Sequence, residues 1–244
     1  MARTKGILFD IGGTLLDFIN VDARRLFYDG ALQAYEYVRG LGQPVPDFRI
    51  YHRGQFVAVH WHYAWSRLTG WEFNALDVLG RLSRGMGQQL TPAQLEELAW
   101  RWYEPLGRCA TCEPGLAQML EDFRRQGLRL GLVSNTFIPG TVLDRHLARE
   151  GLLGFFDTRI YSCDVRYRKP HRRIFHIALE GIGCSPQETV FVGDRLRADI
   201  FGANRVGMTS VLKDPTGRLR SRRARPDHRI LALTELGQLV RAMA

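Results

Sequence analysis

Two short apolar runs that each end in an aspartate constrain this chain most strongly. Residues 7–9 lead into Asp10, and residues 190–192 lead through Gly193 into Asp194. Such continuously apolar runs, rich in β-branched and aromatic residues, are typical of strands buried on both faces of a parallel sheet. Loops that leave the carboxyl ends of these strands line the ligand crevice of an open α/β fold, so we expect both aspartates to lie there.

Other polar residues follow the same pattern. The apolar run 128–133 ends in Ser134 and Asn135, Lys169 precedes a proline-marked amphipathic helix, and Asp199 follows Asp194. Taken singly, an aspartate beside glycine is an ordinary turn former. Taken together, three converging carboxylates require a cation, and hard oxygen ligands favour Mg²⁺ completed by a substrate phosphate.

On these segments the chain resembles the haloacid dehalogenase superfamily of phosphatases and related hydrolases, over its whole length. The first family motif is a nucleophilic aspartate followed by Gly-Thr, matched by Asp10 and by Gly13 and Thr14. The second motif is a Ser or Thr that ends a strand, matched by Ser134. Any one such motif is weak, but several in order at suitable spacing are a strong signal.

The remaining two family motifs are also present. A lysine commonly followed by proline is matched by Lys169 and Pro170, and a Gly-Asp pair with a later aspartate is matched by residues 193–199. The resemblance implies that Asp10 attacks phosphorus and forms an aspartyl phosphate, with Lys169 as a second catalytic residue. It implies Mg²⁺ held by Asp10, the backbone carbonyl of Gly12, Asp194 and Asp199, and phosphate bound by Thr14, Ser134, Asn135 and Lys169.

The chain departs from the family at Gly12, where most members carry a second aspartate that acts as general acid and base. Such assistance is typically worth about 10²–10⁴-fold in rate. Three alternatives follow: a slow phosphatase, a phosphatase with a substitute acid, or a weak or inactive phosphoester-binding relative. Dehalogenases carry an aromatic residue there and lack the metal acids, and phosphonate hydrolases use a cap lysine, which this chain lacks because its lysines are Lys5, Lys169 and Lys213.

The alternation of predicted strands and helices indicates a three-layer, doubly wound parallel sheet with a Rossmann-like core. Residues 1–16 and 111–244 form this core, and residues 17–110 form an inserted helical cap. We expect cap helices over 21–41, 48–68, 73–86 and 93–103, the last with Thr91 as its N-cap. The resemblance implies that the cap carries substrate specificity.

Two short segments of the predicted cap region have alternative interpretations. His60 and His62, between Trp61 and Trp65, fit the surface of a bundle helix, but either histidine could replace the missing acid or base, and the aromatic residues could line a substrate pocket. Cys109 and Cys112 are spaced like a redox or zinc motif, yet no second pair exists, which favours reduced thiols near a hinge.

The formal net charge of +9 raises nucleic-acid binding as a distant alternative. Five arginines between residues 218 and 225 have no interleaved aromatic residues, so a solvated basic loop is the preferred interpretation. The first apolar run follows Arg3 and Lys5 without a signal-peptide h-region, and no run approaches a membrane span. We therefore expect a cytoplasmic protein with a small phosphorylated substrate and no membrane partner.

Overall fold

The computed structural model describes residues 3–18 and 21–243. A six-stranded sheet with the order β5-β4-β1-β6-β7-β8 is parallel throughout. The strands are β1 (Gly6–Phe9), β4 (Arg129–Ser134), β5 (Thr158–Tyr161), β6 (Thr189–Gly193), β7 (Thr209–Lys213) and β8 (His228–Ile230). Along the chain, β4 and β5 are added on one side of β1, and β6, β7 and β8 are then added on the other side, so the direction of strand addition reverses at β1.

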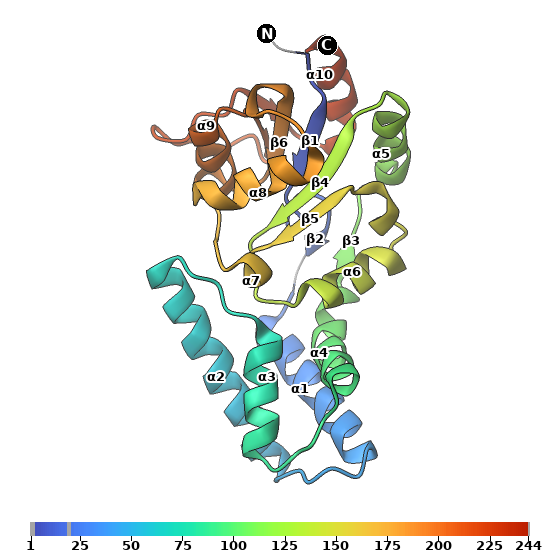
Figure 1. Ribbon diagram of the computed structural model, residues 1–244, viewed down its shortest axis with the longest axis vertical. Helices are drawn as coiled ribbons and strands as arrows, with labels where there is room; N and C mark the ends of the chain where they lie inside the picture. The colour runs from blue at the N-terminus through green and yellow to red at the C-terminus, as the bar shows by residue number, and fades with distance from the viewer. Residues whose placement is uncertain (1–2, 19–20, 244) are drawn as a thin grey trace. The chain divides into compact units, whose positions relative to one another are not determined.

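Helices cover both faces of this sheet (Figure 1). On one face lie α8 (Arg172–Ile182) and α9 (Phe201–Val206), and on the other lie α5 (Leu116–Arg125) and α10 (Leu236–Ala242). The apolar side of α8 packs against Leu8, Val133 and Phe191, one residue from each of the three central strands. The predicted three-layer, doubly wound sheet is therefore confirmed, with its switch point at β1.

The chain divides into two compact units by its internal contacts. The first contains Met1–Asp17, Thr111–Asn135 and Leu147–Ala244, and the second contains Phe18–Ala110 with Thr136–His146. This division differs from the predicted one at residues 136–146, which the sequence assigns to the core. The physical reason is the Phe137 ring, which stacks on Phe73 with centroids 5.1 Å apart, while the Phe137 carbonyl accepts from Ala75 N.

The second unit is built mainly from helices α1 (Ala23–Gly40), α2 (Phe48–Thr69), α3 (Ala75–Gly85) and α4 (Pro92–Gly107), with the amino-terminal part of α6 (Gly140–Arg149). The Thr91 side chain accepts from Gln94 N, and the Gln94 side chain accepts from Thr91 N, so the predicted cap of α4 is confirmed. Two short strands, β2 (Asp17–Phe18) and β3 (Ala110–Thr111), pair with each other.

Shorter elements complete the described chain. They are η1 (Leu153–Phe155), α7 (Ser162–Val165), η2 (Pro186–Glu188), η3 (Leu196–Ile200) and η4 (Leu233–Glu235). The segment that contains the 218–225 arginines connects β7 to β8 without a helix or strand. Over residues 3–18 and 21–243, no helix has the length and apolar character needed to cross a bilayer.

Candidate active site

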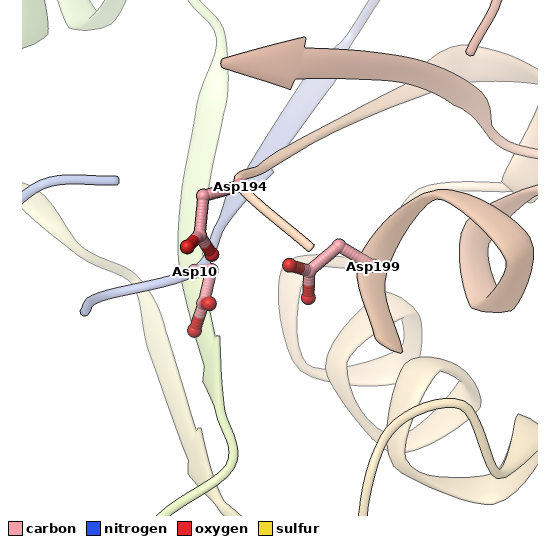
Figure 2. A group of neighbouring side chains, drawn as sticks. All are labelled: Asp10, Asp194 and Asp199. Carbon is pink, nitrogen blue, oxygen red and sulfur yellow. The ribbon is translucent and has the colours of Figure 1, made fainter. Parts of the chain in front are cut away.

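Three aspartates meet beyond the carboxyl ends of the central strands. Asp10 directly follows β1, Asp194 directly follows β6, and Asp199 lies in η3. One carboxylate oxygen from each residue lies within 4.8 Å of the other two (Figure 2). The backbone fixes this arrangement, because Asp10 N donates to Val192 O at 2.9 Å and so holds the start of one loop against the end of the neighbouring strand.

Lys169 forms ion pairs with two of these aspartates. Its Nζ lies 2.8 Å from Asp10 Oδ1 and 2.7 Å from Asp199 Oδ1, and it donates to Val133 O at 2.7 Å. These three contacts match the three donors of an ammonium group. Burial on its own lowers the lysine pKa, but the two adjacent carboxylates outweigh burial and raise it. Lys169 is therefore a fixed positive charge.

The cluster carries more negative charge than Lys169 can neutralise. Three ionised carboxylates against one ammonium leave two negative charges uncompensated. Burial first, and then the charge of Asp10, raise the pKa of Asp194 to about 6; burial first, and then repulsion from the other two aspartates, raise that of Asp199 to about 7 despite Lys169. Among the described residues, buried Asp194 Oδ1 has no hydrogen-bond partner. This oxygen-rich set with two excess charges fits a divalent cation.

Two glycines allow the acidic side chains to come this close. A Cβ added to Gly193 would lie 2.5 Å from the Cβ of Asp199, and one added to Gly13 would lie 2.5 Å from Asp194 Oδ2. Gly13 also has φ +78°, a left-handed conformation that favours glycine. The Gly-Asp and Gly-Thr pairs of the sequence thus have a steric explanation in this site.

The loop after Asp10 leaves key oxygens accessible. Asp10 Oδ1 accepts from Ile11 N at 2.8 Å and also contacts Lys169, so both interactions fall on the same oxygen and leave Oδ2 to other partners. Gly12 forms an isolated parallel bridge with Leu16. The hydrogen bonds of this bridge use Ile11 O and Gly13 N, so the Gly12 carbonyl lies outside them. Gly12 offers no side-chain acid.

The predicted hydroxyl residues belong to the same unit of the chain. Ser134 is the buried last residue of β4, the strand next to β1. Thr14 is buried in the loop after β1, and within the described part of the chain its Oγ1 has no hydrogen-bond partner. A buried hydroxyl without a partner carries a desolvation penalty that a bound ligand would relieve.

Asn135 has a different environment from the one expected of a phosphate ligand. Its Nδ2 donates to Lys169 O at 2.9 Å, and its Oδ1 accepts from Lys169 N at 2.7 Å. The side-chain amide therefore fixes the backbone of Lys169. The partner lies 34 residues away, so the sequence alone does not reveal this pairing.

The second, helical unit contains His60 and His62, the two residues that could replace the missing acid or base. His62 Nδ1 contacts Ala58 O at 3.0 Å and its Nε2 contacts Arg81 at 3.0 Å, so both ring nitrogens are engaged. His60 Nδ1 contacts Phe56 O, and its ring stacks on Phe56 with centroids 3.8 Å apart.

Cys109 Sγ donates to Pro105 O, and the four cysteines are free thiols.

A second buried lysine, Lys213, lies at the end of β7. Lys213 Nζ lies 3.2 Å from Asp17 and 2.8 Å from Glu113, and it donates to Thr14 O at 2.8 Å. Asp17 begins β2, and Glu113 follows β3, so one ammonium group joins the two segments that lead into and out of the helical insertion. A lysine directly after the apolar pair Val211 and Leu212 was the available signal.

Lys213→Met is expected to lower the free energy of unfolding by about 3 kcal/mol, because it leaves two carboxylates facing each other without their buried cation. This loss lies at the lower end of the usual range for breaking a buried ion pair, because Asp17 is partly exposed. Urea denaturation of wild type and variant measures the effect. Lys5→Met is the matched control, since the exposed Lys5–Glu188 pair should change stability little. Equal effects of the two substitutions would contradict this role for Lys213.

With the geometry established, comparison with known proteins identifies the family. The model of the haloacid dehalogenase-like hydrolase family matches residues 4–207. The chain belongs to the haloacid dehalogenase-like hydrolases. The family resemblance indicated by the motifs is thus confirmed.

Individual relatives match over different lengths. Glyceraldehyde 3-phosphate phosphatase of Methanothermobacter thermautotrophicus is 38% identical over 101 residues, which are 41% of this chain and 43% of that protein. The enzyme of the same name from Pyrococcus furiosus is 28% identical over 86% of this chain and 81% of its own length. The matched regions span about two fifths of the length of the first curated relatives.

A solved structure of this family has the same fold. The crystal structure of a HAD phosphatase from Thermococcus onnurineus is 28% identical, covers 97% of this chain and 98% of its own, and superposes with a TM-score of 0.62. The likeness therefore extends over both the core and the insertion.

Proposed function

We propose that this haloacid dehalogenase-like hydrolase is a Mg²⁺-dependent phosphomonoester phosphatase that acts on a small phosphorylated metabolite. The observation that carries the proposal is the cluster of Asp10, Asp194 and Asp199 with Lys169 bound between two of them. The phosphatase names of the relatives from M. thermautotrophicus and P. furiosus support the reaction class. The net charge of +9 would attract anionic substrates.

In this proposal each residue has a distinct task. Asp10 Oδ2, the oxygen that Lys169 and Ile11 N leave open, attacks phosphorus and forms an aspartyl phosphate while the bond from phosphorus to the ester oxygen breaks and that oxygen leaves with the alcohol. Lys169 holds Asp10 through its ion pair and adds positive charge beside the phosphoryl group. Thr14 and Ser134 hydrogen-bond phosphate oxygens, whereas Asn135 holds the Lys169 loop.

Mg²⁺ held by Asp10, Asp194, Asp199 and the Gly12 carbonyl would supply charge that offsets repulsion between the nucleophile and the phosphoryl group. The two uncompensated charges of the cluster and the unpartnered Asp194 Oδ1 support a divalent ion in this place. The proposal is tested by assaying hydrolysis of p-nitrophenyl phosphate and a panel of phosphorylated metabolites with Mg²⁺ and with EDTA. Turnover that is unchanged in EDTA would overturn it.

A weak or inactive phosphoester-binding relative is the second candidate, and Gly12 favours it. Without an acid at this position, protonation of the leaving oxygen and activation of water need another group. The two histidines of the helical unit already contact backbone carbonyls through Nδ1, and His62 contacts Arg81 as well. Tight binding of inorganic phosphate without turnover of any panel member would support this candidate.

The pH dependence of stability should show the metal site directly. The pKa values of Asp194 and Asp199 are raised to about 6 and about 7, above those of an unfolded chain. These groups therefore favour folding when protonated, and metal-free protein should lose stability as the pH rises through 6 and 7. Mg²⁺ should raise the melting temperature clearly at pH 8 and little at pH 5, as measured by scanning calorimetry.

Asp194→Asn provides the control for this measurement. The variant removes one carboxylate with almost no change in volume, so the effect of Mg²⁺ at pH 8 should be lost. An equal Mg²⁺ stabilisation at both pH values, or a full effect in Asp194→Asn, would show that the ion binds elsewhere.

A further inference from the structure

Helix α2 carries an apolar stripe on its exposed face that the proposed function does not use. The stripe, called here the α2 stripe, consists of Ile50, Gly54, Val57, Trp61, Ala64 and Leu68. Leu68, Trp61, Ile50 and Val57 are 83%, 68%, 64% and 57% exposed, and Trp65 beside them is 59% exposed. Single exposed apolar residues are ordinary, but a continuous row along one helix marks an interaction surface.

The α2 stripe lies away from the face that anchors the helix. The buried residues of α2 are Tyr51, Gln55, Val59 and Ser66. At 100° per residue, these four centre about 140° around the helix from the stripe. A Cβ added to Gly54 would have no neighbouring atom within 4 Å, so the space in front of this residue is open. The helix thus packs one face within its own unit, and the other face has no partner among the described residues of that unit.

The spacing of the stripe is that of a helix-pairing seam. Its members are separated by 4, 3, 4, 3 and 4 residues, which is the alternation found where two helices pack lengthwise. The row is also symmetric about residue 59. In an antiparallel pair centred there, Ile50 faces Leu68 of the other helix, Gly54 faces Ala64, and Val57 faces Trp61. Small residues meet small ones, and large meet large.

From this symmetry we propose that the α2 stripe is a dimer interface that binds a second copy of this chain, with the two α2 helices antiparallel. A two-fold interface must be self-complementary, so that each residue pairs with one partner in both directions. The α2 stripe meets this condition because its residues are arranged symmetrically about residue 59. Its large side chains and Trp65 expose roughly 650 Å², taking about 200 Å² for each full side chain. That is most of the about 800 Å² per partner found in stable interfaces.

The charged residues of α2 provide a test that distinguishes a second copy of the chain from other partners. Helix α2 contains Arg49, Arg53 and Arg67 and no acidic residue. All three arginines lie on the same side of the stripe, and like sides meet in an antiparallel two-fold pair, so Arg53 of one copy approaches Arg67 of the other. Added salt should therefore strengthen dimerisation by screening this repulsion. An acidic protein or an anionic lipid surface would instead bind more weakly as salt increases.

Analytical ultracentrifugation of the full chain tests the interface. We expect a dimer at micromolar concentration whose dissociation constant falls from 50 to 500 mM NaCl and rises at least tenfold in Val57→Asp. Leu231→Asp, at an exposed apolar residue outside α2, is the matched control and should dimerise like wild type. A wild-type monomer at 200 µM, or a dimer unaffected by Val57→Asp, would overturn the proposal.

Cysteine cross-linking tests the register independently of affinity. Gly54→Cys combined with Ala64→Cys should give an interchain disulfide under mild oxidation, because these positions face each other. Neither single variant should do so, since two copies of position 54 lie about 15 Å apart along the helices. Cross-linking by a single variant would refute the antiparallel register. A different result would be that wild type binds vesicles that contain phosphatidylglycerol, with binding weakened by salt and by Val57→Asp. That result would show that the α2 stripe binds a lipid surface and not a second copy.

Discussion

Asp10→Asn is expected to lower turnover of p-nitrophenyl phosphate by at least about 10³-fold, because an amide oxygen cannot form the aspartyl phosphate. The substitution keeps the size of the side chain, so the Lys169 and Ile11 N contacts at Oδ1 can persist. Steady-state rates at saturating Mg²⁺ measure the loss. Rapid acid quench followed by mass spectrometry should find phosphate on Asp10 in wild type and none in the variant.

The control for Asp10→Asn is Asp29→Asn, at an exposed carboxylate of α1 that pairs only with Arg25 in the ion pairs described. It removes the same charge from the chain without touching the cluster, so activity should stay at the wild-type level. Substantial turnover in Asp10→Asn would show that another group attacks phosphorus, and the proposed mechanism would then be wrong.

Gly12→Asp is expected to raise turnover by about 10²–10⁴-fold, the usual contribution of general acid–base catalysis. The backbone at Gly12 forms a bridge to Leu16, whereas the left-handed φ of this loop belongs to Gly13. A side chain at position 12 therefore meets no such backbone strain. Wild type should release the leaving group in a burst and then hydrolyse the aspartyl phosphate slowly, and Gly12→Asp should remove the burst.

Gly12→Asn is the matched control, because it adds a side chain of the same size that cannot transfer a proton. It should leave turnover near the wild-type value. A gain of equal size in both variants would assign the effect to packing. A wild type that already turns over rapidly and is not improved by Gly12→Asp would mean that another group of the protein supplies the acid.

Much of the fold could be predicted from the sequence because its signals are local. The strand runs before Asp10 and Asp194 are continuously apolar, and β1 and β6 form there as neighbours. Helix α2 spans Phe48–Thr69 against the expected 48–68, because Asp47 caps one end and Gly70 ends the other. The convergence of Asp10, Asp194 and Asp199 also followed from local pattern, since the carboxyl ends of adjacent parallel strands share one edge.

What could not be predicted depends on contacts between distant residues. Residues 196–200 form η3, a π-helix in which Ile200 N bonds to Arg195 O. Helical periodicity does not reveal such winding, which is frequent at functional sites. The hydrogen bonds between the Asn135 amide and the Lys169 backbone could not be predicted either, because the two residues lie 34 positions apart. Lys213 lies 196 residues from Asp17, and nothing local connects them.

The pairing of β2 with β3 has a consequence for how such a protein can diversify. Thr111 Oγ1 donates to Asp17 O at 3.3 Å, so the two ends of the inserted segment meet at one place on the core. The segment between β2 and β3 leaves the core and returns to it at one place, so a segment of another length whose ends lie side by side can take its position. The inserted segment between β2 and β3 can therefore differ in size and shape while β1 and α5 keep their positions.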